Sequence, residues 1–244
     1  LATIPYMSEK LMEEDLFQLL SGVNDVLKEH GVALVGGHTA EGAETSLGLT
    51  VTGAADSKSL EKNGASEGDI LLLTKSIGSG VILAGAAAGI SSPESINHCF
   101  GQMDRSNSEG MHVFLENGAS AMTDVTGYGL IGHLSEMLRA SSCGATVNVD
   151  SVGLMKGSEL LIDRGIESSL QKSNELSLLD FEFKNGLKLS APKVKLLVDP
   201  QTAGGLLAAV PRSNSGECLR RLKDLGYEAS VVGQIEEEKV WVIQ

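Results

Sequence analysis

The pattern of apolar and polar positions changes character within residues 122–138. A short apolar run ends at Thr123 and Asp124, and a turn with two glycines, Gly127 and Gly129, follows it. Beyond the turn, apolar residues recur with helical spacing at Leu130, Ile131, Leu134, Met137 and Leu138. We therefore predict a strand, a tight turn and a helix. Such a turn directs backbone N–H groups and the positive end of the helix dipole at whatever lies above it.

Asp124, at the predicted strand end, is the residue of this turn that could bind a metal ion. A carboxylate does not favour a bare phosphate at this place, but it can bind a hard cation such as Mg²⁺, which in turn contacts phosphates. The stretch alone thus indicates a magnesium and nucleotide site. An ordinary strand–turn–helix connection with an aspartate in the turn explains the same residues and stays open at this point.

The N-terminal part predicts one amphipathic helix followed by two strands. Apolar residues at helical spacing predict the helix over residues 8–29, with Ser8 as the N-cap and Gly31 as the residue that ends it. Residues 32–35 are a continuous apolar run, which we interpret as a buried strand. Residues 46–53 alternate in the manner of a strand with one solvated face.

A glycine-rich loop over residues 36–44 connects these two strands. It opens with Gly36, Gly37, His38 and Thr39. Because glycine has no side chain, a ligand can approach the backbone closely at the start of this loop. A flexible hairpin loop is the alternative. His38 by itself is more typical of a loop histidine than of a general base.

The rest of the chain predicts an alternation of strands and helices. Residues 56–66 are polar and rich in turn formers, and we place the domain boundary there. We predict strands at 70–74, 145–149, 195–198, 206–210, 230–233 and 240–243. Helices are predicted at 81–88, 91–118 and 216–225, and over 154–184 with an interruption around 167–179. This alternation is typical of an α/β or α+β fold.

Composition narrows the class of protein. The chain has 244 residues, 42% of them apolar, which is enough for a sizeable core. A net charge of −13 argues against a nucleic-acid partner, since no counterion release would drive binding. No apolar run reaches the length of a membrane span, and no secretory signal opens the chain, so we expect a cytoplasmic protein. Because the chain begins with Leu1, we expect it to be one part of a longer protein.

Other short patterns carry little chemistry. The three cysteines, Cys99, Cys143 and Cys218, have no CxxC spacing, which argues against a zinc site or a disulfide framework. His112 and Glu116 have the spacing of two metal ligands on one helix face, but spacing is all that supports a metal site, and we interpret them as a solvated helix surface. No P-loop motif is present in the sequence.

Three glycine-rich segments together resemble selenophosphate synthetase (selenide, water dikinase), a family of the aminoimidazole ribonucleotide synthetase-like ATP-binding superfamily. The segments are residues 36–44, residues 123–129 and residues 199–205, the last reading Asp-Pro-Gln-Thr-Ala-Gly-Gly. Residues 13–22 and residues 68–75 also look like that family. The similarity covers essentially the whole chain and keeps the family's order.

The resemblance implies an α/β (α+β) fold with the two-domain architecture of aminoimidazole ribonucleotide synthetase. Residues 1–56 match the later half of an N-terminal ATP-binding and dimerisation domain, whose sheet pairs with its copy in a second subunit. Residues 67–244 match the whole of the C-terminal α/β layer domain. A homodimer is therefore expected.

The resemblance also implies a reaction, in which ATP, selenide and water give selenophosphate, AMP and phosphate. Asp124 matches the family aspartate that binds Mg²⁺. Gly36, Gly37, His38 and Thr39 match the loop that contacts ATP, which is shared across the dimer. Asp199 lies in a family signature, and we expect it to have a structural role because its Asp-Pro turn and paired glycines suffice to explain it.

One departure from the family limits what this chain can do. The family's reactive Cys or selenocysteine, its essential Lys and its further Mg²⁺-binding aspartates precede the point that matches Leu1. We therefore predict that the 244 residues alone neither bind Mg-ATP tightly nor turn over. Two alternatives stay open: another ATP-dependent enzyme of the same superfamily, and a dimerising module of a fusion protein without activity of its own.

Overall fold

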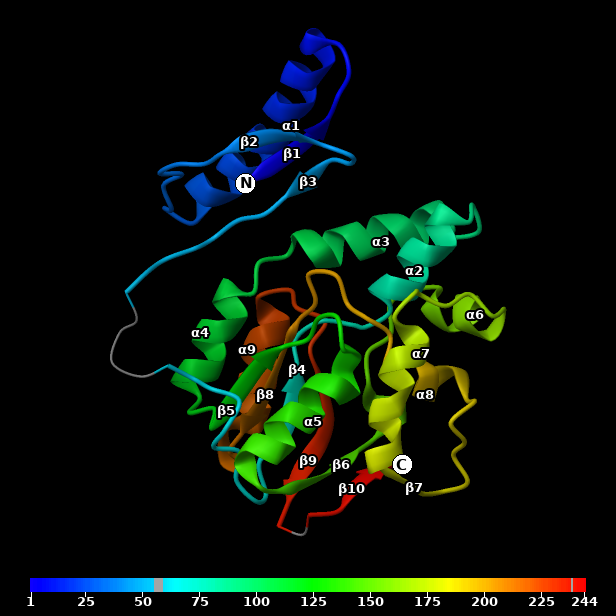
Figure 1. Cartoon of the computed structure of the whole chain (residues 1–244). Helices are drawn as coiled ribbons and strands as arrows, with labels where there is room; N and C mark the ends of the chain where they lie inside the picture. Colours follow the sequence, from blue (N-terminus) through cyan, green and yellow to red (C-terminus); the bar gives the residue numbers. More distant parts are fainter. Residues whose placement is uncertain (55–58, 238) are drawn as a thin grey trace. The chain divides into compact units, whose positions relative to one another are not determined.

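The computed structural model describes residues 1–54, 59–237 and 239–244 and divides the chain into two compact units, residues 1–58 and 59–244 (Figure 1). The first three residues of the predicted boundary at 56–66, and residue 56 at the end of the predicted first domain, lie outside the described residues. Both units mix helices and strands, which confirms the predicted α/β (α+β) class.

The first unit is a small three-stranded sheet with one long helix. Strand β1 (Ala2–Pro5) lies between β2 (Thr39–Gly42), with which it is parallel, and β3 (Ser46–Leu47), with which it is antiparallel. Helix α1 (Glu9–Glu29) follows β1 and begins after Ser8, as predicted. Gly31 has a φ of 65°, the left-handed conformation that ends a helix.

The strands of this first unit differ from those predicted. Residues 32–35 form no strand and are exposed; Val35 is 94% exposed. An apolar run becomes a buried strand only where other elements cover it, and the described part of the first unit supplies no such cover. The predicted loop 36–44 instead contains β2, which pairs with β1, and the strand predicted at 46–53 is limited to β3.

The second unit is built on a seven-stranded sheet in the order β5-β8-β4-β9-β6-β10-β7. Its strands are β4 (Ile70–Leu73), β5 (Ala121–Asp124), β6 (Gly144–Val147), β7 (Glu182–Phe183), β8 (Leu206–Val210), β9 (Ser230–Glu236) and β10 (Trp241–Ile243). Pairing is antiparallel from β5 through to β6, and β10 runs parallel to both β6 and β7.

Helices cover both faces of this sheet (Figure 1). They are α2 (Ser79–Ala87), α3 (Pro93–Asp104), α4 (Ser108–Glu116), α5 (Gly129–Ser141), α6 (Ser158–Asp163), α7 (Gln171–Asn174), α8 (Pro192–Leu196) and α9 (Arg212–Asp224), with 3₁₀ turns η1 (Val149–Ser151) and η2 (Glu175–Asp180). Helices α2 and α9 lie where the sequence predicted helices, and the helical region predicted at 91–118 divides into α3 and α4. The prediction for 154–184 was wrong in detail: the expected interruption around 167–179 contains α7 and most of η2, and residues 182–183 form strand β7.

The segment at residues 195–198 was predicted to be a strand, and this prediction was wrong. Lys195 and Leu196 are the last residues of the short helix α8, which begins at Pro192, and residues 197–198 form a turn after it. Proline suits the first turn of a helix because its missing N–H would have no partner there. The apolar residues after it are buried on every side, so the run contains no alternation that could distinguish a helix from a strand.

Alternate residues of the central strand face two separate apolar cores. Leu71 and Leu73 of β4 belong to the larger core, which is packed beneath α2, α5 and α8. Ile70 and Leu72 face the smaller core, which α4 and α9 cover. Because a strand alternates its side chains between faces, a continuous apolar run is what a sheet covered on both sides requires.

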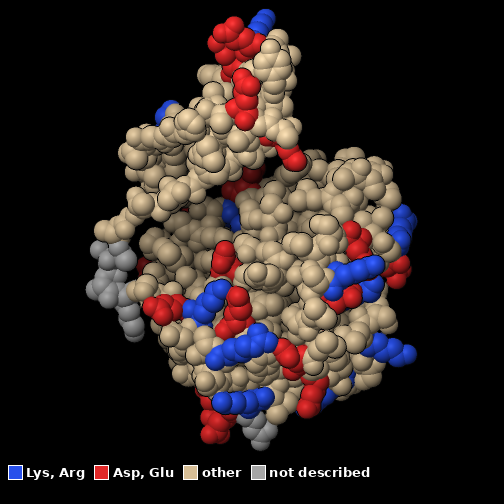
Figure 2. Space-filling view, viewed as in Figure 1, with Lys and Arg blue, Asp and Glu red and all other residues tan. Residues whose placement is uncertain are grey.

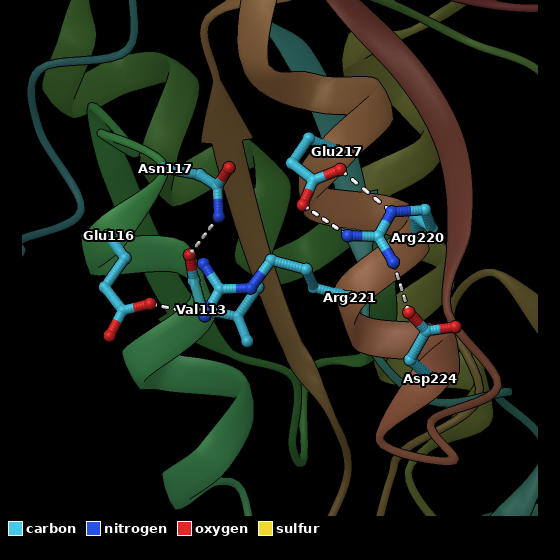
Figure 3. A network of polar contacts seen from close by, with 7 residues as sticks. All are labelled: Val113, Glu116, Asn117, Glu217, Arg220, Arg221 and Asp224. Carbon is cyan, nitrogen blue, oxygen red and sulfur yellow. Dashed lines mark hydrogen bonds and ion pairs between the residues drawn. The ribbon is translucent and has the colours of Figure 1, made fainter.

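Surface ion pairs join the two helices that cover the smaller core (Figure 3). Arg221 of α9 pairs with Glu116 of α4, and Arg220 pairs within α9 with Glu217 and Asp224. All five side chains are substantially exposed, so each pair contributes at most about 1 kcal/mol. Of these pairs only Arg221–Glu116 joins the two helices, and the apolar core beneath them supplies most of the stability.

The three cysteines are free and buried. Burial raises the pKa of the Cys99 and Cys218 thiols to about 11 and also raises the pKa of Cys143. Among the described residues, no helix is both long and apolar enough to cross a membrane.

Candidate functional site

The turn after β5 places Asp124 where a ligand can reach it. Asp124 is exposed at the last position of the strand, and α5 begins five residues later at Gly129. This confirms the predicted strand, turn and helix. The N–H of Val125 donates to the carbonyl of Gly205 at 2.8 Å, so the strand remains tied to the neighbouring chain just beyond Asp124.

The glycine-rich loop 198–205 packs closely against this turn. The N–H of Gln201 donates to the carbonyl of Thr126 at 2.9 Å. A Cβ on Gly129, whose φ is 69°, would lie 2.7 Å from the carbonyl carbon of Val198. A Cβ on Gly204 would lie 2.0 Å from the carbonyl oxygen of Val125. Glycine is therefore required at both positions, and two segments far apart in the sequence form one structure.

Asn174 completes the contact between the turn and the loop, a role that was not predicted. Its side-chain Nδ2 donates to the carbonyl of Gly127 at 2.8 Å and to that of Val198 at 3.0 Å. The residue ends α7, inside a region whose pattern predicted only an interruption. A polar side chain in a segment without clear periodicity carries no local signal of a buried role.

A histidine behind the turn was also missed. His133 of α5 is buried, and its Nε2 lies 3.2 Å from the hydroxyl of Thr126. Burial lowers the pKa of His133, although the nearby Glu136 carboxylate opposes this. Glu136 in turn forms an ion pair with Lys62 at 2.5 Å, which lowers the pKa of Glu136. The helical spacing that predicted α5 could have placed His133 on its buried side.

Asp199 is fully buried and supports the start of α2. Its Oδ2 accepts the N–H of Gly80 at 3.0 Å, and Oε1 of Gln201 accepts the N–H of Gly78 at 2.9 Å. Together they satisfy N–H groups that a helix start otherwise leaves unpaired. Burial raises the pKa of Asp199 to about 7 against the opposing effect of these hydrogen bonds. These contacts agree with the structural role expected for Asp199.

The other predicted binding residues lie together in the first unit. Gly36, Gly37, His38 and Thr39 are all exposed. The carbonyl of His38 accepts the N–H of Ala2 at 2.9 Å, and Thr39 begins β2. The four residues line one side of a hollow of about 410 Å³, whose remaining wall is largely leucine. Asp124 belongs to the second unit, so the predicted residues form two groups, one in each unit.

The described residues contain no cluster of three or more His, Cys, Asp or Glu side chains that could hold a metal ion. Asp124 is thus a single carboxylate at an exposed turn. This donor set suits Mg²⁺ as one protein ligand, because Mg²⁺ keeps several waters and is often held by one or two carboxylates plus substrate phosphates. His112 is exposed, and Glu116 pairs with Arg221.

On the face drawn in Figure 2, Lys and Arg side chains are interspersed with Asp and Glu. Among the described residues, Lys193 pairs with Asp150 at 2.7 Å and Lys195 with Glu167 at 2.6 Å. The distribution adds no support for a polyanion such as nucleic acid.

Comparison with known proteins identifies the family. Residues 66–243 match the C-terminal domain of AIR synthase related proteins, and residues 2–55 match the N-terminal domain. The chain is 35% identical to the selenide, water dikinase of Carboxydothermus hydrogenoformans over 95% of this chain and 67% of that protein. The chain belongs to the selenide, water dikinase family. The homologue from Myxococcus xanthus is 34% identical over 92% of this chain and 64% of its own length.

Solved structures agree with this family at the level of the fold. Escherichia coli HypE superposes with a TM-score of 0.69 at 17% identity, covering 99% of this chain and 67% of that one. The thiamine-monophosphate kinase of Stenotrophomonas maltophilia gives 0.66 at 15%, covering 100% and 70%. Identities this low establish the shared fold alone. As a selenide, water dikinase family member, the chain spans about two thirds of the length of the curated relatives it matches.

Proposed function

We propose that the protein containing this chain converts ATP, selenide and water to selenophosphate, AMP and phosphate. The observation that carries this proposal is the similarity to proteins named selenide, water dikinase, which extends over more than nine tenths of the chain. It includes both the turn at Asp124 and the loop at 36–39. The alternative, another ATP-dependent enzyme of the same superfamily, has less support, because the proteins named HypE and thiamine-monophosphate kinase match this chain only in fold.

In this proposal Asp124 is one ligand of a magnesium ion that accompanies ATP. The exposed carboxylate, the tight turn and the helix start behind it support the assignment. When bound, Mg²⁺ neutralises charge on the phosphates during phosphoryl transfer. The chain's own contribution is to hold Asp124 at a fixed place beside the loop 198–205. Further ligands would come from parts of the natural protein outside these 244 residues.

Gly36, Gly37, His38 and Thr39 are proposed to contact ATP, with the loop shared between the subunits of a homodimer. Their exposure and the absence of bulk at Gly36 and Gly37, where a Cβ would meet nothing within 4 Å, support a close approach of ligand to backbone. The apolar surface that the first unit leaves exposed, including Val35, supports pairing with a second copy. We place the protein in the cytoplasm, in keeping with its three free thiols.

The replacement Asp124→Asn in the natural protein tests the function. Loss of one magnesium ligand is expected to lower the rate of selenide-dependent AMP formation by roughly 100-fold or more, because charge neutralisation by the metal contributes several kcal/mol. Phosphorus NMR measures AMP and selenophosphate together. Asp150→Asn is the control, since Asp150 is exposed and pairs only with Lys193.

Two results would contradict the proposal. The first is an Asp124→Asn protein that retains full activity. The second is a wild-type protein that makes AMP at the same rate with and without selenide. The 244 residues alone are expected to form no AMP, and turnover by this chain would show that the residues outside it are not needed.

A further inference from the structure

Asn174 holds the turn that carries Asp124. The residue is only 7% exposed, and Nδ2 has two hydrogens, which it donates to Gly127 and Val198. An Asn amide has no more than two donors, so both are used. The two acceptors come from different segments, the turn 124–129 and the loop 198–205. The side chain therefore acts as a bridge between them.

The position of this bridge makes it different from the other contacts of the turn. Val125 and Thr126 are held by backbone hydrogen bonds to Gly205 and Gln201, which no side-chain replacement removes. Gly127 comes next, and a Cβ there would meet nothing within 4 Å, so packing does not confine it. The hydrogen bond from Asn174 is the side-chain contact that the described residues make to the carbonyl of Gly127, between the backbone contacts at Val125 and Thr126 and the close packing of Gly129 against Val198.

We propose that Asn174 is a positioning residue for metal binding at Asp124. By donating to the carbonyl of Gly127, it supports the path of the turn between Asp124 and the start of α5, and so the space beside the Asp124 carboxylate where a metal would bind. This inference rests on the proposed function, in which Asp124 is a magnesium ligand. Loss of a group that hydrogen-bonds a metal ligand directly typically costs 10- to 100-fold in metal affinity. Asn174 acts through the turn and not on Asp124 itself, so we expect an effect at the lower end of this range.

Asn117 provides a matched control within the same unit. It is also 7% exposed, and its Nδ2 also donates to a backbone carbonyl, that of Val113, at 2.8 Å (Figure 3). It follows the end of α4 and makes no contact with the turn. Replacing either asparagine by alanine removes a buried amide, so both variants should lose stability, but only one should affect metal binding.

The experiment uses Mn²⁺ as the probe on the 244-residue chain. Mn²⁺ takes the oxygen ligands that Mg²⁺ takes, and its unpaired electrons broaden the NMR signals of nearby amides. A titration followed at the amides of residues 125–129 gives an apparent dissociation constant even when binding is weak. We expect Asn174→Ala to raise that constant about 10-fold, Asn174→Ser to have an intermediate effect, and Asn117→Ala to leave it unchanged.

Asp124→Asn separates this inference from the proposed function. If Asp124→Asn abolishes the broadening and Asn174→Ala binds Mn²⁺ as the wild type does, the role of Asn174 is refuted while the metal site stands. If Asp124→Asn leaves the broadening unchanged, the turn holds no metal and the inference is refuted, whereas the proposed function is decided separately by AMP formation in the natural protein carrying Asp124→Asn. An equal loss of affinity in Asn174→Ala and Asn117→Ala would also refute the inference, because the effect would then follow stability. Should Asn174→Ala fail to fold, Asn174→Ser decides by the same criteria.

Discussion

The helices α1 and α5 show how differently the two units use similar sequence patterns. Both helices are amphipathic and were predicted from the same spacing of apolar residues. α1 has 21 residues and buries none of them, whereas α5 has 13 and buries eight. In the second unit a seven-stranded sheet receives the apolar face, but the first unit has three short strands. Periodicity thus predicts that a helix forms. The surrounding elements determine how much of its apolar face is buried and therefore how much the helix stabilises the fold.

The same contrast extends to polar groups. Among the described residues, every buried polar or charged side chain belongs to the second unit, Asp199 and Asn174 included. Asp199 and Asn174 are held by hydrogen bonds from segments that pack closely around them. The first unit should therefore depend on an additional surface for its stability, and the proposed second subunit is such a surface.

The largest expected difference between the units is in the stability lost when a leucine is replaced by alanine. Leu72 is fully buried in the smaller core, so Leu72→Ala should lower the free energy of unfolding by about 2.7–5 kcal/mol. Leu11 of α1 is largely exposed, so Leu11→Ala should cost within about 0.5 kcal/mol. Urea unfolding followed by circular dichroism measures both. Equal costs would mean that another surface already covers α1.

Asp199 should make the stability of the second unit depend on pH. Its carboxyl has a pKa of about 7 when folded against an ordinary 3.8, so the folded state binds more protons between these values. The free energy of unfolding should therefore fall as pH rises from about 4 to about 7, by at most about 4 kcal/mol. Urea titrations followed by the fluorescence of Trp241 at pH 5 and pH 8 would show it.

Asp199→Asn should remove this slope while keeping an oxygen that can accept the N–H of Gly80. Asp150→Asn, at an exposed carboxylate of the same unit, should keep it. A slope that survives in Asp199→Asn would assign the pH dependence to other groups.

A smaller contrast concerns the glycines of the two candidate binding segments. Gly129→Ala combines a left-handed φ with a Cβ 2.7 Å from Val198, so we expect a loss of about 2 kcal/mol. Gly37→Ala meets open space and has no left-handed φ, so its effect should stay below about 1 kcal/mol. Thermal unfolding of the two variants gives the comparison. A large loss in Gly37→Ala would indicate that the loop 36–39 is more closely packed than its exposure suggests.

Elements of the second unit were predicted well where the local sequence pattern alone determines the element. Residues 70–73 are apolar throughout because both sheet faces are covered, and residues 121–141 change from strand to helix at a turn that needs Gly129. Prediction failed at 195–198, where a short buried run contains no alternation. It also failed at 32–35, because an apolar run does not record whether anything covers it.

Residues of the candidate site were predicted only where a local sequence pattern indicates ligand binding. Asp124 after an apolar strand and before a glycine turn is such a signal, as are the paired glycines at 36–37. Asn174, His133 and the partner atoms on loop 198–205 gained their roles through contacts between distant segments. Their assembly depends on how β5, β8 and α7 pack, which spacing along the chain does not encode.

The burial of all three thiols has a practical consequence for labelling. Thiol reagents react with the thiolate, and Cys99, Cys143 and Cys218 are both buried and shifted towards the protonated form. The native chain therefore serves as an unreactive background for maleimide chemistry. A single cysteine introduced at the exposed Tyr6 or Tyr128 would accept a spectroscopic probe selectively, one in each unit. Pairs of such probes would yield distances between the units in solution without any native cysteine being replaced.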